Sequence, residues 1–171
     1  LSEAAEIVKS GGIIVYPTET VYGIGALYSN EQAIQRIFSL KGRDSHRPVL
    51  ILIRDINDLK MVATEVSDKA LSFATRYWPG PLTLLFHARP SLSPLLKGQG
   101  KKIGCRISSS PLTRKLLSYI EAPITSTSAN LSGDNLNCCN INQLPDFIYN
   151  SVDVILDAGE AGSGVPSTVI D

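Results

Sequence analysis

Short apolar runs alternate with amphipathic segments along the whole chain, as in proteins that contain both strands and helices. The run Ile13–Tyr16 is rich in β-branched residues and stops at Pro17, so it predicts a buried strand that leads into a loop. Such runs predict strands over Ile13–Tyr16, Val49–Ile53, Leu82–His87, Ile103–Ile107, Ile124–Ser126, Val154–Leu156 and Ser167–Ile170. Apolar residues three and four positions apart predict helices over Glu3–Ser10, Glu31–Leu40, Ile56–Ala63, Asp68–Tyr77, Pro111–Ile120 and Gln143–Ser151.

Residues that start and stop helices support this assignment. Ser110 offers a capping hydroxyl directly before Pro111, which favours a helix start. Trp78-Pro79-Gly80-Pro81 ends the preceding helix and turns the chain into the next strand. The mixed order of strands and helices predicts one α/β domain over residues 1–171, with a sheet that contains both parallel and antiparallel pairs.

The composition is that of an ordinary globular protein. A chain of 171 residues with 43% hydrophobic and 19% charged residues can bury a core, which argues against disorder. The formal net charge of +0 gives no overall attraction to nucleic acid, so any RNA contact must come from a local patch.

Cys105, Cys138 and Cys139 form no CxxC pair, and only two histidines accompany them. We therefore expect reduced thiols in the cytoplasm and no metal site. No apolar stretch approaches the length of a membrane span, so we expect no membrane partner.

The segment Pro17–Gly25 follows the first predicted strand and has the composition of a loop. Its hydroxyls, carboxylate and glycines can hydrogen-bond a polar ligand and let the backbone approach it. Taken alone, a simple strand-to-loop turn is the favoured interpretation.

Three cations, Lys41, Arg43 and Arg47, lie within seven residues after the second predicted helix. The helical period places Lys41 on the same face as four apolar residues, Ala33, Ile34, Ile37 and Phe38. A lysine point charge and an arginine fork both suit phosphate. A solvated helix end, where cations complement the helix dipole, is the alternative, and spacing alone favours it.

Two further segments carry polar groups in apolar surroundings. Thr125–Asn130 offers four hydroxyls and one amide at a strand end, which suits phosphate or ribose recognition but is equally typical of a turn with local hydrogen bonds. Arg106 lies between apolar residues of a predicted strand, where a buried guanidinium needs a partner and a carboxylate matches its fork. The alternative is an edge strand with this side chain in water.

The glycine-rich segment Gly159–Gly164 lacks the Gly-Lys-[Ser/Thr] ending of a phosphate-binding loop. We interpret it as a flexible linker to the strand that contains Pro166-Ser167-Thr168.

Four segments in this order, Pro17–Gly25, Lys41–Arg43, Ser126–Gly133 and Pro166–Asp171, resemble the YrdC/Sua5 family. The resemblance covers nearly the whole chain and implies a twisted open sheet around a concave pocket, with a C-terminal tail that this chain lacks. It implies an enzyme that joins L-threonine, bicarbonate and ATP, the last with Mg²⁺, into threonylcarbamoyl-adenylate for threonylcarbamoyladenosine modification of tRNA at position 37. The implied partners are the proteins that transfer this group to tRNA, together with weak binding of tRNA or double-stranded RNA.

The resemblance also assigns roles to residues. Lys41 and Arg43 would be catalytic, since cations neutralise phosphate charge during transfer. The threonine site would consist of Thr20, Arg106, Ser126 and Thr168, with the arginine on the carboxylate. The ATP site would consist of Arg43, Arg47, Ser128 and Asn130. Directly after Gly133, over Asp134–Cys139, the chain departs from the family pattern, and no role is assigned to that stretch.

Two other functions are compatible with the sequence. A related domain in hydrogenase-maturation proteins handles carbamoyl-adenylate, but it is embedded in a much longer chain. A double-stranded-RNA-binding module without catalysis is the second alternative. The net charge of +0 and 6% aromatic residues weaken it, because phosphate attraction and base stacking are both poorly supplied.

Overall fold

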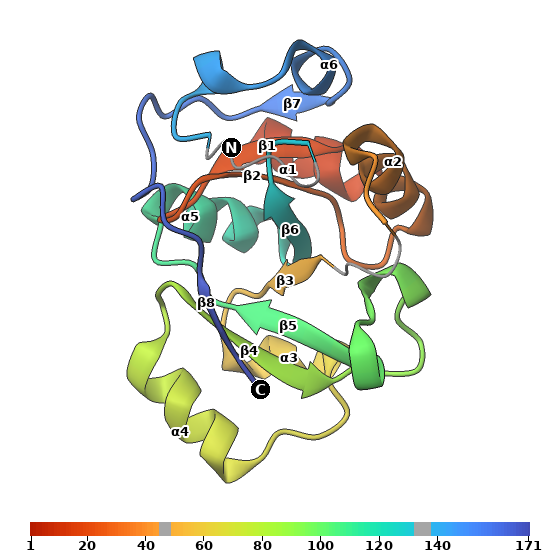
Figure 1. The fold of residues 1–171 in the computed structure, drawn as a ribbon, viewed down its shortest axis with the longest axis vertical. Coiled ribbons are helices and arrows are strands. Elements are labelled where there is room, and N and C mark those ends of the chain that lie inside the picture. Colours follow the sequence, from red (N-terminus) through yellow and green to blue (C-terminus); the bar gives the residue numbers. More distant parts are fainter. Residues whose placement is uncertain (45–48, 132–137) are drawn as a thin grey trace.

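The computed structural model describes residues 1–44, 49–131 and 138–171, and its strands form one open sheet (Figure 1). The strands are β1 (Ile14–Pro17), β2 (Tyr22–Gly25), β3 (Leu50–Leu52), β4 (Leu82–His87), β5 (Lys102–Arg106), β6 (Ile124–Ser128), β7 (Val154–Ile155) and β8 (Thr168–Ile170). Their order across the sheet is β7-β1-β2-β6-β3-β5-β4-β8. The β7/β1, β3/β5 and β4/β8 pairs are parallel and the others antiparallel, which confirms the predicted mixed α/β sheet.

Helices cover both faces of this sheet. They are α1 (Ser2–Lys9), α2 (Glu31–Lys41), α3 (Leu59–Val62), α4 (Asp68–Tyr77), α5 (Pro111–Ile120) and α6 (Asp146–Tyr149), with 3-10 turns at Ile56–Asp58, Pro94–Leu96, Gln99–Lys101 and Ile141–Gln143. Ile14 and Tyr16 pack with α1 and α5, whereas Ile13 and Val15 pack with α2 on the opposite face. The first apolar run is therefore buried on both sides, which explains why it lacks polar alternation.

Most predicted elements are confirmed within one or two residues, and two predictions are wrong. Pro17–Gly25 is not a loop throughout, because its second half forms β2 and pairs with β1 and β6. A Cβ atom on Gly25 would lie 2.0 Å from the Thr125 carbonyl oxygen, so a glycine is required where β2 meets β6. The predicted helix Gln143–Ser151 is reduced to a 3-10 turn and the short α6, which begins after Pro145.

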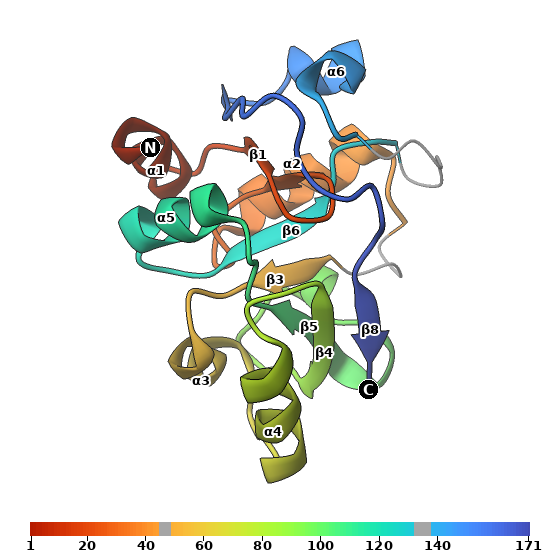
Figure 2. The same ribbon diagram turned by 90° about the vertical axis from the view of Figure 1, so that its left-hand side faces the viewer.

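The last part of the chain joins the two ends of the sheet. β7 pairs with β1 at one edge and β8 pairs with β4 at the other. Figures 1 and 2 show the intervening segment running from the end of the molecule that carries β7 to β8, which begins near the middle. We call residues 159–167 the strap. No helix in the described part of the chain is long and apolar enough to cross a bilayer.

Candidate functional site

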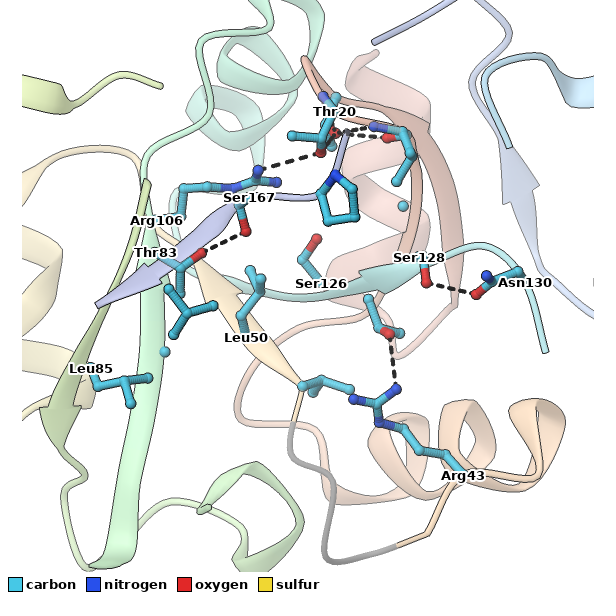
Figure 3. Close-up of a pocket in the computed structure, with 18 residues that line it drawn as sticks. Thr20, Arg43, Leu50, Thr83, Leu85, Arg106, Ser126, Ser128, Asn130 and Ser167 are labelled. Atoms are coloured by element: carbon cyan, nitrogen blue, oxygen red, sulfur yellow. Dashed lines mark hydrogen bonds between the residues drawn. The ribbon is translucent and has the colours of Figure 1, made fainter. Parts of the chain in front are cut away.

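A pocket of about 660 Å³ lies over the middle of the sheet, beneath the strap (Figure 3). Figure 3 shows Thr20, Arg106 and Ser167 at one end of it and Arg43, Ser128 and Asn130 at the other. Its lining comprises Thr18, Thr20, Val21, Gly23, Arg43, Val49, Leu50, Thr83, Leu85, Gly104, Arg106, Ser126, Thr127, Ser128, Asn130, Pro166, Ser167 and Val169. The structure thus gathers six predicted site residues, Thr20, Arg43, Arg106, Ser126, Ser128 and Asn130, from four separate segments.

Thr20 is fixed by a tight turn between β1 and β2. The Thr18 hydroxyl donates to the Val21 carbonyl oxygen over 2.6 Å and accepts from the backbone N–H groups of Thr20 and Val21, each at 3.2 Å. The Thr20 hydroxyl lies 2.8 Å from that of Thr18. Because the turn is closed by its own side chain, Thr20 is presented to the pocket without relying on a ligand.

Arg106 lies at the end of β5 and is only 3% exposed. Its Nη1 is 3.2 Å from Glu19 Oε1 and donates to the Thr20 hydroxyl at 3.4 Å. The Ser108 hydroxyl donates to the other carboxylate oxygen of Glu19. Within the described residues Arg106 Nε is buried without a hydrogen-bond partner. The edge-strand alternative for Arg106 is wrong, since β5 lies between β3 and β4.

The end of β6 forms the other part of the pocket. The Ser128 hydroxyl donates to Asn130 Oδ1 over 2.6 Å, and Arg43 Nη1 donates to the Thr127 hydroxyl at 3.4 Å. Gly42 ends α2 in the left-handed region, with φ of 55°, and so turns the chain toward this strand. The turn brings the Arg43 guanidinium into the pocket wall.

Lys41 does not line the pocket. It is 1% exposed, and its ammonium donates to the carbonyl oxygens of Ser128 and Asn130 and, at 3.3 Å, to Asn130 Oδ1. Burial, together with the neighbouring Arg43 guanidinium, lowers the pKa of Lys41 to about 8. The predicted contact of Lys41 with phosphate is therefore not the arrangement that the structure presents.

The strap is anchored rather than a free linker, so that prediction is wrong. The backbone N–H groups of Ser163 and Gly164 donate to the carbonyl oxygens of Glu19 and Thr20 at 3.0 and 2.9 Å. Gly162 adopts φ of 81°, and a Cβ there would lie 2.2 Å from the Thr20 carbonyl oxygen. Only glycine lets the strap approach the Thr20 turn this closely.

Thr168, which was predicted to contact threonine, does not line the pocket, whereas its neighbour Ser167 does. Alternation along β8 turns Ser167 and Val169 toward the pocket, and Thr168 is exposed outside it. One of the hydroxyls of Ser167 and Thr83 donates to the other over 2.9 Å. Arg47 lies outside the described residues. Within the described ranges, no three His, Cys, Asp or Glu side chains gather where they could hold a metal ion.

Sequence reasoning missed Glu19, Ser108 and Thr83 as parts of the site. Glu19 was visible as a carboxylate in the Pro17–Gly25 segment, but its partner Arg106 is far away in the sequence. Ser108 precedes the cap residue Ser110, which accepts from the N–H of Thr113, and nothing in the local sequence indicates a bond from Ser108 to Glu19. A lone threonine in an apolar strand, as at Thr83, gives no signal of its own.

The sequence matches a known family and several curated proteins. The Sua5/YciO/YrdC family model, described as telomere recombination, matches residues 6–171. Curated proteins named threonylcarbamoyl-AMP synthase are 37% identical in Pyrococcus abyssi, 33% in Bacillus subtilis and 35% in Vibrio vulnificus, over 98%, 99% and 95% of this chain. The chain spans about half the length of the first two relatives, 49% of each, and 87% of the third.

Solved structures give the same grouping. The structure of P. abyssi Sua5 complexed with L-threonine superposes with a TM-score of 0.93 at 35% identity, covering 99% of this chain and 50% of that one. Escherichia coli YciO gives 0.85 at 28% identity, covering 99% and 82%. Full-length HypF, at 18% identity and a TM-score of 0.80, shares the fold.

Proposed function

The chain belongs to the Sua5/YciO/YrdC family, and from this premise and its pocket we propose that it joins L-threonine, bicarbonate and ATP into threonylcarbamoyl-adenylate. The observation that carries the proposal is a single pocket with Arg106 and Thr20 at one end and Arg43 with Ser128 and Asn130 at the other. A carboxylate and a phosphate can thus be held in one cavity, as joining an amino acid to a nucleotide requires.

Threonine binds at the Arg106 end in this proposal. Glu19 engages only Nη1 of Arg106, so part of the guanidinium fork is left for a substrate carboxylate. Thr20 and Ser126 supply hydroxyls beside it. We assign to Ser167 the threonine contact that the resemblance implied for Thr168, because Ser167 lines the pocket.

The chemistry is two successive substitutions. The neutral amine of threonine adds to the carbon of bicarbonate, and loss of water leaves a carbamate. A carbamate oxygen then attacks the α-phosphorus of ATP, the bond from that phosphorus to the oxygen bridging the β-phosphate breaks, and pyrophosphate leaves. Arg43 stabilises the phosphate charge that shifts during transfer, while Ser128 and Asn130 orient the nucleotide. Arg47 remains a predicted ATP ligand.

Mg²⁺ enters this proposal as part of the substrate MgATP. Among the residues that the structure describes, those that line the pocket include hydroxyls and one amide but no carboxylate. Phosphates and water would therefore supply most ligands of the ion, as is usual for Mg²⁺ on nucleotides. The product would pass to proteins that transfer the threonylcarbamoyl group to tRNA, in the cytoplasm where tRNA and ATP occur together.

Mass spectrometry of a reaction containing the protein, MgATP, bicarbonate and L-threonine tests this function. Threonylcarbamoyl-adenylate and pyrophosphate should appear together, and omission of threonine or bicarbonate should abolish both. Serine in place of threonine is the matched control for amino-acid choice. Formation of a carbamoyl-adenylate from carbamoyl phosphate without threonine would instead assign the chain to the chemistry of hydrogenase maturation.

A further inference from the structure

We propose that Lys41 is a positioning residue that holds the end of β6 from behind the pocket wall and acts on the nucleotide only through Ser128 and Asn130. This inference rests on the proposed function for the identity of the ligand. It departs from a role in which the lysine contacts phosphate directly.

The ammonium of Lys41 uses all of its hydrogen-bond donors within the protein. A lysine ammonium has three N–H donors. Lys41 Nζ meets three acceptors, the carbonyl oxygens of Ser128 and Asn130 and the side-chain Oδ1 of Asn130. All three donors are engaged within the protein, so contact with a phosphate would require one of these bonds to break.

The position of Lys41 in the fold places its side chain behind the pocket wall. It is the last residue of α2, which packs into the core through Ile34, Ile37 and Phe38. The side chain therefore leaves a fixed helix and reaches the strand end from the core side. Arg43 lies only two residues further on, yet it lines the pocket. Gly42 between them, in the left-handed region, separates a cation behind the wall from a cation in front of it.

Lys41 also determines the orientation of the Asn130 side chain. Its Oδ1 accepts from Lys41 Nζ and from the Ser128 hydroxyl, at 3.3 and 2.6 Å. Two donors converging on one oxygen fix which end of the amide faces the lysine. The ammonium thereby sets the side-chain orientation of Asn130 and, through the two carbonyl bonds, the backbone path of residues 128–130.

These contacts predict how the loss of Lys41 spreads to the ligand. Without the ammonium, two buried carbonyl oxygens and Oδ1 lose a charged donor, and the segment shifts to recover hydrogen bonds. Displacement of the Ser128–Asn130 segment should lower the affinity for every nucleotide that contacts it, whatever the number of phosphates. A lost phosphate contact would instead weaken ATP far more than AMP.

Calorimetric titration of AMP and of MgATP into the wild type and Lys41→Met separates these outcomes. We expect both affinities to fall by a similar factor, roughly tenfold, so that the ratio of the two dissociation constants stays within about twofold. Arg43→Met is the matched comparison, since its pocket-facing cation should lower affinity for ATP more than for AMP. Loss of ATP affinity alone in Lys41→Met would overturn the positioning role.

A second variant and a ligand-free measurement protect the test. Lys41→Gln supplies two neutral N–H donors, so it should recover part of the affinity for both nucleotides if the donors matter. Hydrogen exchange at residues 127–131 should be faster in Lys41→Met than in the wild type without any ligand. Unchanged exchange there would overturn the positioning role, whereas a wild type that binds neither AMP nor ATP would overturn the proposed function.

Discussion

Replacing Arg106 by alanine should weaken threonine binding and destabilise the fold, and the two effects are separable. The guanidinium is proposed to hold a carboxylate that is unchanged during the reaction, so its contact is shared by ground and transition states. Loss of such a contact raises KM and leaves kcat nearly unchanged. A charge-assisted contact contributes about 1.5–3 kcal/mol, which corresponds to a rise in threonine KM of roughly 10- to 150-fold.

The fold is destabilised because Glu19 loses the cation that it pairs with. Breaking a buried ion pair costs about 3–5 kcal/mol because the remaining charge is unpaired. Glu19 is 14% exposed and keeps its bond from Ser108, so the loss should lie near the lower end of that range. Adding Glu19→Gln to Arg106→Ala removes the unpaired charge. The double variant should regain thermal stability without regaining threonine affinity.

Arg54 offers a matched control outside the pocket. Its Nε and Nη2 donate to the two carboxylate oxygens of Asp58, at 2.9 and 2.7 Å, and the Asp58 side chain is 3% exposed. Arg54→Ala should therefore lower the melting temperature and leave threonine KM unchanged. Steady-state kinetics with threonine and ATP varied separately, beside thermal unfolding, make the comparison. An unchanged threonine KM in folded Arg106→Ala would refute the reasoning and make this arginine purely structural.

Two further predictions concern the phosphate end of the pocket. Arg43→Ala should chiefly lower kcat, with a smaller loss of ATP affinity and no change in threonine KM, because the phosphate charge that Arg43 faces is redistributed during transfer. Steady-state kinetics with both substrates varied measure this, and a change confined to the KM for ATP would contradict it. Binding of double-stranded RNA should be weak and should collapse between low and physiological salt, since the net charge is +0 and, of the three neighbouring cations Lys41, Arg43 and Arg47, Lys41 is buried. Filter binding across salt concentrations measures it, and tight binding at physiological salt would count against the prediction.

The elements with strong local signals were predictable from the sequence. Asp68–Tyr77 and Pro111–Ile120 have capping serines and regular apolar spacing, and both helices have the predicted bounds. β2 was not predictable in this way, because Tyr22-Gly23-Ile24-Gly25 contains two glycines, which weaken a strand signal, and is held by neighbours on both sides. Propensity cannot report such tertiary support.

The site was predictable in its membership more than in its geometry. The helical period placed Lys41 on the core face, and the structure agrees; the resemblance alone directed this side chain to phosphate. The pairing of Glu19 with Arg106 joins residues 87 positions apart, and no local pattern reports a partner at that distance. That Ser167 rather than Thr168 lines the pocket follows from the register of β8 against β4, which depends on the assembled sheet.

The path of the strap has a consequence for how this protein is made. The backbone N–H of Ile13, directly before β1, donates to the carboxylate of Asp153, which is made 140 residues later, and β8 joins β4 later still. A ribosome adds about 5–20 residues per second, so the outward edges of β1 and β4 wait several seconds for the strands that cover them. During that interval they are open strand edges, the kind of surface that pairs with other chains. The strap, which donates hydrogen bonds to Glu19 and Thr20, is made with the same segment, so the nascent chain has the proposed substrate-binding side chains before it has a pocket.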